Sequence, residues 1–148
     1  MRLSTKGRYG LRALVDLALN AREEHVPLYS IAERQGISIQ YLEHVFSALR
    51  KAGIVKSVKG PRGGYSLSEP AGQILIGPVL EVLEGSHSIL KDLQQDEEAP
   101  GPIERAVRQR LWKPVDDAVA GILDTTTLED LAEEARRLDA ATQTMYFI

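Results

Sequence analysis

The segment at residues 54–67, reading IVKSVKGPRGGYSL, limits the possible folds more than any other part of the chain. Two short β-prone runs flank a glycine-rich tip at residues 59–64, a pattern that predicts a β-hairpin. Two helical patterns precede it, at residues 30–35 and 38–52, with Gly36 between them. Helix, turn, helix and then a basic hairpin is the order of a winged helix-turn-helix. The sequence therefore predicts a mainly α fold with a small β-wing.

The charge of the chain is unevenly distributed. Residues 1–70 hold 11 Lys/Arg and 6 Asp/Glu, whereas residues 71–148 hold 7 and 15, so a half of charge +5 precedes a half of charge −8. Between His44 and Arg62 the chain has basic residues and no acid, namely Arg50, Lys51, Lys56, Lys59 and Arg62. A local basic face on an acidic protein is typical of phosphate binding. An ordinary solvated face has the same composition, but the neighbouring hairpin favours double-stranded DNA as the partner.

Other functional classes find little support in the residues. The chain has no cysteine, which excludes disulfides and any cysteine-ligated metal or iron–sulfur site. His25, His44 and His87 lack the spacing of metal ligands, and no catalytic Ser/His/Asp grouping, phosphate loop or dinucleotide fingerprint is present. We therefore expect no enzyme activity and no cofactor. The absence of a signal peptide and of a long apolar run predicts a cytoplasmic protein without a membrane partner.

The helix predicted at residues 38–52 is the candidate recognition helix. Its apolar stripe consists of Leu42, Val45, Phe46, Leu49 and Ala52, and Gly53 should end it. The opposite face carries Ser38, Gln40, Glu43, His44, Ser47 and Arg50. Glutamine can pair with adenine edges and glutamate with cytosine amino groups. The alternative is that this is simply a solvated polar face, as on most exposed helices.

The sequence around this motif predicts further elements. An amphipathic helix should span residues 7–21, and residues 26–29 could add a short edge strand. Ser30 is a candidate N-cap with Glu33 in the capping-box position. A short helix should follow at residues 76–83, with a proline in its first turn.

The second half of the chain predicts a long helix with a narrow apolar seam. The seam consists of Ile103, Val107, Leu111, Val115, Val119 and Ile122. Pro114 interrupts the helix and should either kink it or cost one backbone hydrogen bond. Such a seam beyond the core domain favours a homodimer, although the helix could instead pack on its own domain. Thr126 and Glu129 should cap a last helix at 128–138, followed by a flexible apolar tail. Three parts result: a DNA-binding domain (1–84), a connector loop (85–102), and the dimerisation helix with the C-terminal helix and tail (103–148).

Several stretches of the chain resemble the Rrf-type winged-helix transcription regulators, the family of IscR, NsrR and CymR. They are STKGRYG at the N-terminus, YLE in the third helix and GPRGGY at the wing, together with LDTTTLEDLAEEA near the end. The resemblance implies a winged helix-turn-helix that binds DNA. Several members of the family hold an iron–sulfur cluster through three cysteines in the connector, and this chain has none. The resemblance therefore implies a regulator without a cluster.

The resemblance also implies which residues contact DNA. The N-terminal backbone clamp would be Arg2, Ser4, Thr5, Lys6 and Tyr9, and the recognition helix would contribute Ser38, Gln40, Tyr41 and Glu43, with Arg50 on the same face. The wing tip would be Lys59, Gly60, Pro61, Arg62, Gly63 and Gly64. Glycines there allow close backbone approach, and the two cations can enter a minor groove or bind phosphate. Arg62 stands where relatives often have a small residue, which adds a charge at the tip.

Within the family, the segments DTTTLEDLA and LW…DAV are most similar to the cysteine-less CymR branch. That resemblance implies a repressor of cysteine and sulfur metabolism that could be gated by the cysteine synthase O-acetylserine thiol-lyase. A regulator of iron–sulfur genes that has lost its cluster is an alternative, because the first half of the chain is equally similar to IscR. A third possibility is a winged-helix protein-interaction module that does not read DNA sequence.

Overall fold

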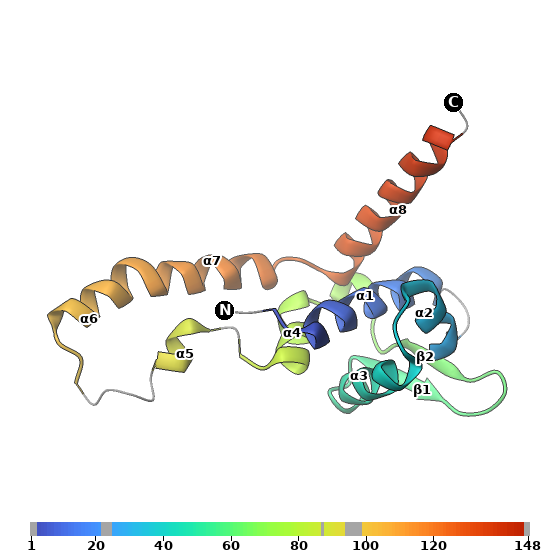
Figure 1. Cartoon of the computed structure of the whole chain (residues 1–148), viewed down its shortest axis with the longest axis horizontal. Coiled ribbons are helices and arrows are strands. Elements are labelled where there is room, and N and C mark those ends of the chain that lie inside the picture. Colours follow the sequence, from blue (N-terminus) through green and yellow to red (C-terminus); the bar gives the residue numbers. More distant parts are fainter. Residues whose placement is uncertain (1–2, 22–24, 87, 94–98, 147–148) are drawn as a thin grey trace.

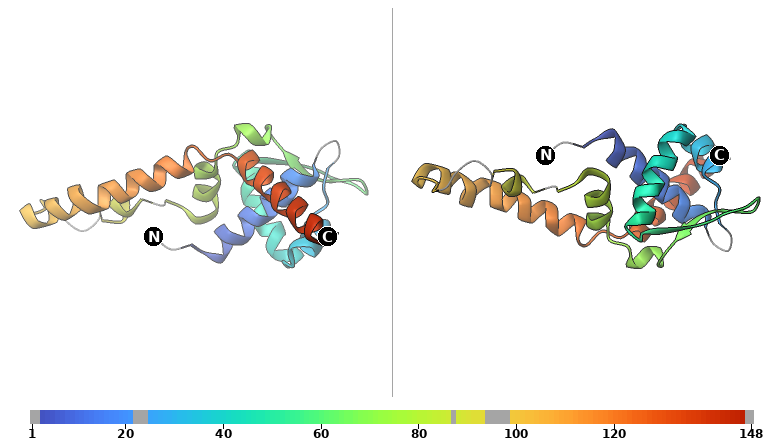
Figure 2. Two further views of the ribbon diagram at one scale, coloured as in Figure 1. Left: turned by 90° about the horizontal axis from the view of Figure 1, so that it is seen from above. Right: turned by 90° about the horizontal axis from the view of Figure 1, so that it is seen from below.

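The computed structural model describes residues 3–21, 25–86, 88–93 and 99–146. A helical domain carries the β-wing at one end, and a long helical arm leaves it at the other (Figures 1 and 2). The elements are α1 (Thr5–Asn20), α2 (Leu28–Gln35), α3 (Ile39–Lys51), β1 (Val55–Val58), β2 (Gly64–Leu67), a 3₁₀ turn (Ala71–Gln73), α4 (Ile76–Glu84), α5 (Ile89–Leu93), α6 (Pro102–Val107), a π turn (Arg108–Trp112), α7 (Lys113–Leu123) and α8 (Leu128–Tyr146). The predicted mainly helical fold with a two-stranded wing is confirmed.

The core of the domain lies between α1, α2, α3, α4 and the first half of α8. Its largest fully buried side chains include Phe46, Leu14, Leu17, Ile31, Leu42 and Leu49. The predicted first helix is confirmed, but it begins two residues before the expected start because the Ser4 hydroxyl accepts a hydrogen bond from the Gly7 N–H (3.1 Å). Burial of several leucines at about 1.5–3 kcal/mol each is the main stabilising contribution here.

The helix-turn-helix consists of α2 and α3. Gly36 ends α2 in the left-handed conformation (φ 64°), which glycine adopts without steric cost. The predicted capping box of Ser30 and Glu33 is wrong, because α2 begins at Leu28 and Ser30 lies inside its first turn. Pro27, with φ fixed near the helical value, precedes the helix in place of a capping side chain.

The wing is an antiparallel pair in which Val55 lies opposite Leu67 and Val58 opposite Gly64. The edge strand expected at residues 26–29 is reduced to one bridge, in which Val26 and Tyr65 exchange backbone hydrogen bonds of 2.9 and 2.8 Å. It cannot continue because α2 starts two residues later. The Tyr65 ring packs edge-on against Phe46 of α3, with centroids 5.0 Å apart, so the base of the wing is fixed to α3.

The arm comprises α6, the π turn and α7, and none of its residues is buried in the described chain. The predicted interruption at Pro114 takes the form of this π turn, in which the Lys113 N–H bonds to the Arg108 carbonyl five residues back. A proline in a regular helix clashes with the carbonyl four residues before it. The wider turn accommodates the ring without ending the helix.

The connector is not simply the expected loop, because it contains the short helix α5. Its N-terminus is held by the Asp116 carboxylate of α7, which accepts hydrogen bonds from the Ser88 hydroxyl (2.7 Å) and from the Ile89 and Leu90 N–H groups (2.9 and 3.1 Å). Partial burial works to raise the pKa of Asp116, but these three hydrogen bonds outweigh it and hold the pKa below its usual value.

The last helix differs from expectation at both ends. The capping box is formed by Thr127 and Asp130, not by Thr126 and Glu129: the Thr127 N–H donates to the Asp130 carboxylate (2.9 Å) and the Asp130 N–H to the Thr127 hydroxyl (3.1 Å). The chain then stays helical to Tyr146, where a flexible tail was expected, because no glycine or proline interrupts it. The final two residues lie outside the described part.

The division of the chain into three parts at residues 84 and 102 remains a prediction. The C-terminal helix, however, packs in part on the first domain. Leu128 and Ala132 are fully buried, and α8 crosses and packs on α1 (Figure 2). A bridge between Leu75 and Thr127 also joins the start of α8 to the segment before α4 by backbone hydrogen bonds. No helix in the described part of the chain is long and apolar enough to cross a bilayer.

Acid should release α5 from the arm. Because the pKa of Asp116 is lower in the folded chain than in the unfolded one, its contribution is complete above the ordinary aspartate range near ~3.9 and is lost as the pH falls through the folded value. Asp116→Ala removes the same hydrogen bonds at neutral pH. In this variant, hydrogen-exchange mass spectrometry should therefore show faster exchange at the Ile89 and Leu90 amides than in the native protein. Asp117→Ala, which removes the neighbouring acid paired with Lys113, should leave those amides protected; equal exchange in both variants would contradict this role.

Candidate nucleic-acid interface

Helix α3, the candidate recognition helix, presents most of the polar face that the sequence predicts, although Ser47 is half-buried. Leu42, Val45, Phe46 and Leu49 are fully buried, while Gln40, Glu43, His44 and Arg50 are exposed. Ala52 is exposed, contrary to the prediction, because α3 ends at Lys51. Ser38 caps the helix, its hydroxyl accepting the Tyr41 N–H at 3.2 Å. Gln40, Glu43 and Arg50 are thus free to face a base edge or a phosphate, and their contacts with DNA remain a prediction.

The wing tip is a tight turn that displays two cations. The Gly63 N–H bonds to the Gly60 carbonyl (2.9 Å), so Pro61 and Arg62 occupy the central positions of a β-turn. Lys59, Pro61 and Arg62 are all exposed. A pre-formed turn holds the Arg62 side chain at the end of the hairpin, where it can enter a groove or bind phosphate.

Gly64 lies at the base of the wing, where the chain leaves no room for a side chain. A Cβ at this position would overlap the backbone of Val26, and its φ of 157° is one that other residues rarely adopt. Gly64 therefore allows the hairpin to pair with Val26 at the edge of the domain.

The N-terminal segment is fixed by α4. The Ser4 N–H and hydroxyl both donate to the Glu84 carboxylate, at 2.7 and 3.0 Å, and Gly7 leaves the space that this carboxylate occupies. Ser4 thus takes part in four hydrogen bonds within the protein, because its carbonyl also accepts one from the Arg8 N–H (3.1 Å). Thr5 is exposed and Lys6 half-buried. The predicted clamp residue Arg2 lies outside the described residues.

An aromatic contact joins the N-terminal segment to the recognition helix. The rings of Tyr9 on α1 and Tyr41 on α3 meet edge-on with centroids 6.1 Å apart. The guanidinium groups of Arg8 and Arg12 lie 5.7 and 5.3 Å from the centre of the Tyr9 ring, within the range of a cation–π interaction. The sequence analysis did not select these two arginines, although their four-residue spacing places them on one helix face.

The described residues provide no site for an iron–sulfur cluster. Cluster irons require thiolate ligands, and the chain contains no cysteine. In the described part of the chain no group of three or more His, Asp or Glu side chains could hold a metal ion. The donor set therefore does not fit the cofactor found in some regulators of this type.

Comparison with known proteins identifies the family. A family profile described as an iron-dependent transcriptional regulator, Rrf2, matches residues 3–134. The chain belongs to the Rrf2 family. IscR of Photorhabdus laumondii is 42% identical over 141 residues, covering 95% of this chain and 85% of that relative. IscR of Cronobacter sakazakii is 41% identical over the same length.

Solved structures of Rrf2-family proteins share the fold. CymR of B. subtilis superposes with a TM-score of 0.77 at 42% identity, covering 90% of this chain and 98% of that chain. IscR of T. potens gives a TM-score of 0.73 at 40% identity, covering 91% and 88%. This protein is therefore an Rrf2-family DNA-binding transcriptional regulator similar to IscR and CymR, not an enzyme, and without cysteine it has no cysteine-ligated cluster.

Removing the exposed cation at the wing tip should weaken DNA binding in a salt-dependent way. If Arg62 contacts one phosphate, Arg62→Ala should reduce the slope of log K against log [salt] by about 0.9. Fluorescence anisotropy across a salt series measures this slope. Arg105→Ala, which removes an exposed arginine on α6, should leave it unchanged; an unaltered slope in Arg62→Ala would exclude the phosphate contact.

Proposed function

We propose that this Rrf2-family regulator is a sequence-specific, dimeric repressor that works without an iron–sulfur cluster and controls genes of cysteine and sulfur metabolism. The observation that carries base reading is the exposed face of α3, with Gln40 and Glu43, beside the cationic tip of the wing. These are side chains of the types that pair with base edges in a major groove. The N-terminal residues and the wing support α3 from two sides and are suited to the phosphate backbone.

The arm supports the dimer. Four of its six seam residues are exposed, namely Ile103 (81%), Val107 (36%), Leu111 (48%) and Ile122 (65%). Val115 and Val119 are half-buried. A row of apolar side chains on a helix that leaves its own domain is stabilised by a second helix. A two-fold pair of arms would present two recognition helices and two wings to a pseudo-palindromic operator.

The sulfur branch is supported by the CymR likeness. That protein is described as the global cysteine regulator of B. subtilis, and its structure covers most of this chain. Gating by the cysteine synthase O-acetylserine thiol-lyase follows only from the same resemblance. Because IscR relatives are equally similar in sequence, a cluster-free regulator of iron–sulfur genes is the second candidate. A module that binds only protein partners is the third, and the DNA experiment below separates it from the other two.

Selection from a randomised duplex pool tests the proposal most directly. The recovered sequence is then compared with scrambled DNA across a salt series. A pseudo-palindrome bound with at least ~10³-fold preference supports a dimeric reader of sequence, and its half-sites can be compared with promoters of sulfur and iron–sulfur genes. Weak, unselective binding both alone and with the cysteine synthase would overturn the proposal and favour a protein-interaction module.

A charge in the seam should separate the dimer. Leu111→Glu places a carboxylate in the centre of the apolar row, where pairing of two arms would bury it at a cost of several kcal/mol. Sedimentation velocity should give this variant half the mass of the native dimer. In a DNA-binding assay the variant should no longer bind the full palindrome. Gln109→Glu adds the same charge outside the seam and should stay dimeric. A native protein that is monomeric at micromolar concentration would refute the dimer.

Substitution of Glu43 should alter sequence preference instead of overall affinity. If Glu43 accepts a hydrogen bond from a base edge, Glu43→Ala should relax selectivity at one position of each half-site by about 1–3 kcal/mol. Affinities for a panel of single-base operator variants measure this change. Glu133→Ala, on the exposed side of α8, should leave the panel unchanged. Equal weakening on every operator in the Glu43 variant would argue against base reading.

A further inference from the structure

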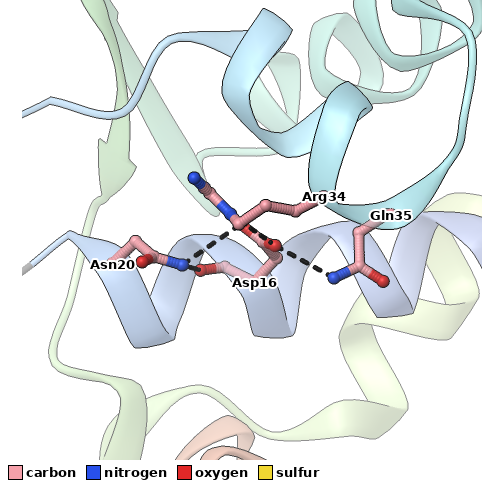
Figure 3. Close-up of polar contacts among 4 residues, drawn as sticks. All are labelled: Asp16, Asn20, Arg34 and Gln35. Carbon is pink, nitrogen blue, oxygen red and sulfur yellow. Dashed lines mark hydrogen bonds and ion pairs between the residues drawn. The ribbon is translucent and has the colours of Figure 1, made fainter.

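One acidic side chain of α1 is buried beside the helix-turn-helix. Asp16 is only 3% exposed and is the one charged side chain buried within the described residues. Arg34 of α2 donates to it from Nε and Nη2, with a shortest distance of 2.7 Å. Gln35 Nε2 donates at 2.9 Å and Asn20 Nδ2 at 3.3 Å (Figure 3). The hydrogen bond to Asp16 raises the pKa of Arg34.

The two donors from α2 are placed where they control the direction of α3. Arg34 and Gln35 are the last residues of α2, directly before the left-handed turn at Gly36. Only three residues separate Gln35 from Ile39, the first residue of α3. A displacement of the end of α2 is therefore carried through this short turn to the recognition helix.

Arg12 holds the same turn from a second point on α1. Its Nη2 donates to the Gln35 main-chain carbonyl at 2.7 Å, one of the carbonyls that a helix end leaves without a partner. Arg12 lies one helical turn before Asp16, and its guanidinium also faces the Tyr9 ring. Tyr9 in turn contacts Tyr41 of α3. Helix α1 thus holds α3 at the preceding turn and at its first helical turn.

We infer that Arg12 and Asp16 are positioning residues for base reading, because they fix the recognition helix relative to the N-terminal segment. This role rests on the proposed sequence-specific function. Phosphate contacts tolerate small displacements of a helix, since the charge acts over several ångströms. A bidentate contact with a base edge requires the donor and acceptor within hydrogen-bonding geometry. Loss of the restraint should therefore reduce discrimination between sequences more than it reduces affinity for DNA in general.

Arg8 and Arg12 provide a matched pair for the test. Both are exposed cations facing the Tyr9 ring, one turn apart, but only Arg12 bonds to α2 among the described contacts. Arg12→Ala and Arg8→Ala remove the same charge, so both should weaken binding to scrambled DNA alike. The preference for the selected operator over scrambled DNA should fall at least about tenfold in Arg12→Ala, as when one bidentate base contact is lost. It should stay near the native value in Arg8→Ala.

A second variant separates positioning from folding. Asp16→Asn keeps the shape of the side chain and can still accept from Gln35, but it loses the ion pair with Arg34. With an unchanged circular dichroism spectrum at the assay temperature, it should also lose discrimination while keeping its salt slope. Equal discrimination in the Arg12 and Arg8 variants would overturn the inference. Failure of the native protein to select any operator would instead refute the proposed function, and the inference with it.

Discussion

The ion pair of Asp16 and Arg34 is the constraint on which the DNA-facing half of the molecule depends. A carboxylate buried to this degree is tolerated only with charged and hydrogen-bonding partners. Removing one partner of a fully buried pair costs about 3–5 kcal/mol, and the 41% exposure of the Arg34 side chain lowers that cost here. The pair ties α1 to the end of α2 at a fixed rotation. The hydrophobic core supplies the stability of the domain, but an apolar contact does not fix direction as a bidentate hydrogen bond does.

The arm is stabilised differently from the domain. None of its residues is buried. Local ion pairs such as Glu104–Arg108 and Lys113–Asp117 each contribute only about 0.3–0.5 kcal/mol to the stability of the helix. Most of the stability of a helix in a protein comes from packing of its apolar face. The order of the arm therefore depends on α5, which Asp116 holds against it, and on whatever covers the seam.

The sequence predicted best those features of the fold that depend only on residues close together in the chain. The tip residues of the wing, the turn at Gly36 and the stripe from Leu42 to Leu49 all follow from neighbouring residues, and all are confirmed. Three consecutive threonines made the cap of α8 ambiguous by one residue, and Thr127 is used. Helix α5 could not be predicted, because its capping carboxylate, Asp116, lies more than twenty residues away in the chain. Arg8 and Arg12 are alike in sequence, and only the structure distinguishes them.

The π turn in the arm has a geometrical consequence for the seam. Apolar residues spaced every four positions drift around a regular helix by about 40° per step, because each residue turns the chain by about 100°. Ile122 lies nineteen positions after Ile103, which on a regular helix would leave these side chains about 100° apart. The π turn takes up one extra residue in the helical winding and cancels about that angle. Ile103 and Ile122 then point in nearly the same direction, so the two ends of the seam face the same side of the arm, which they would not do on a regular helix.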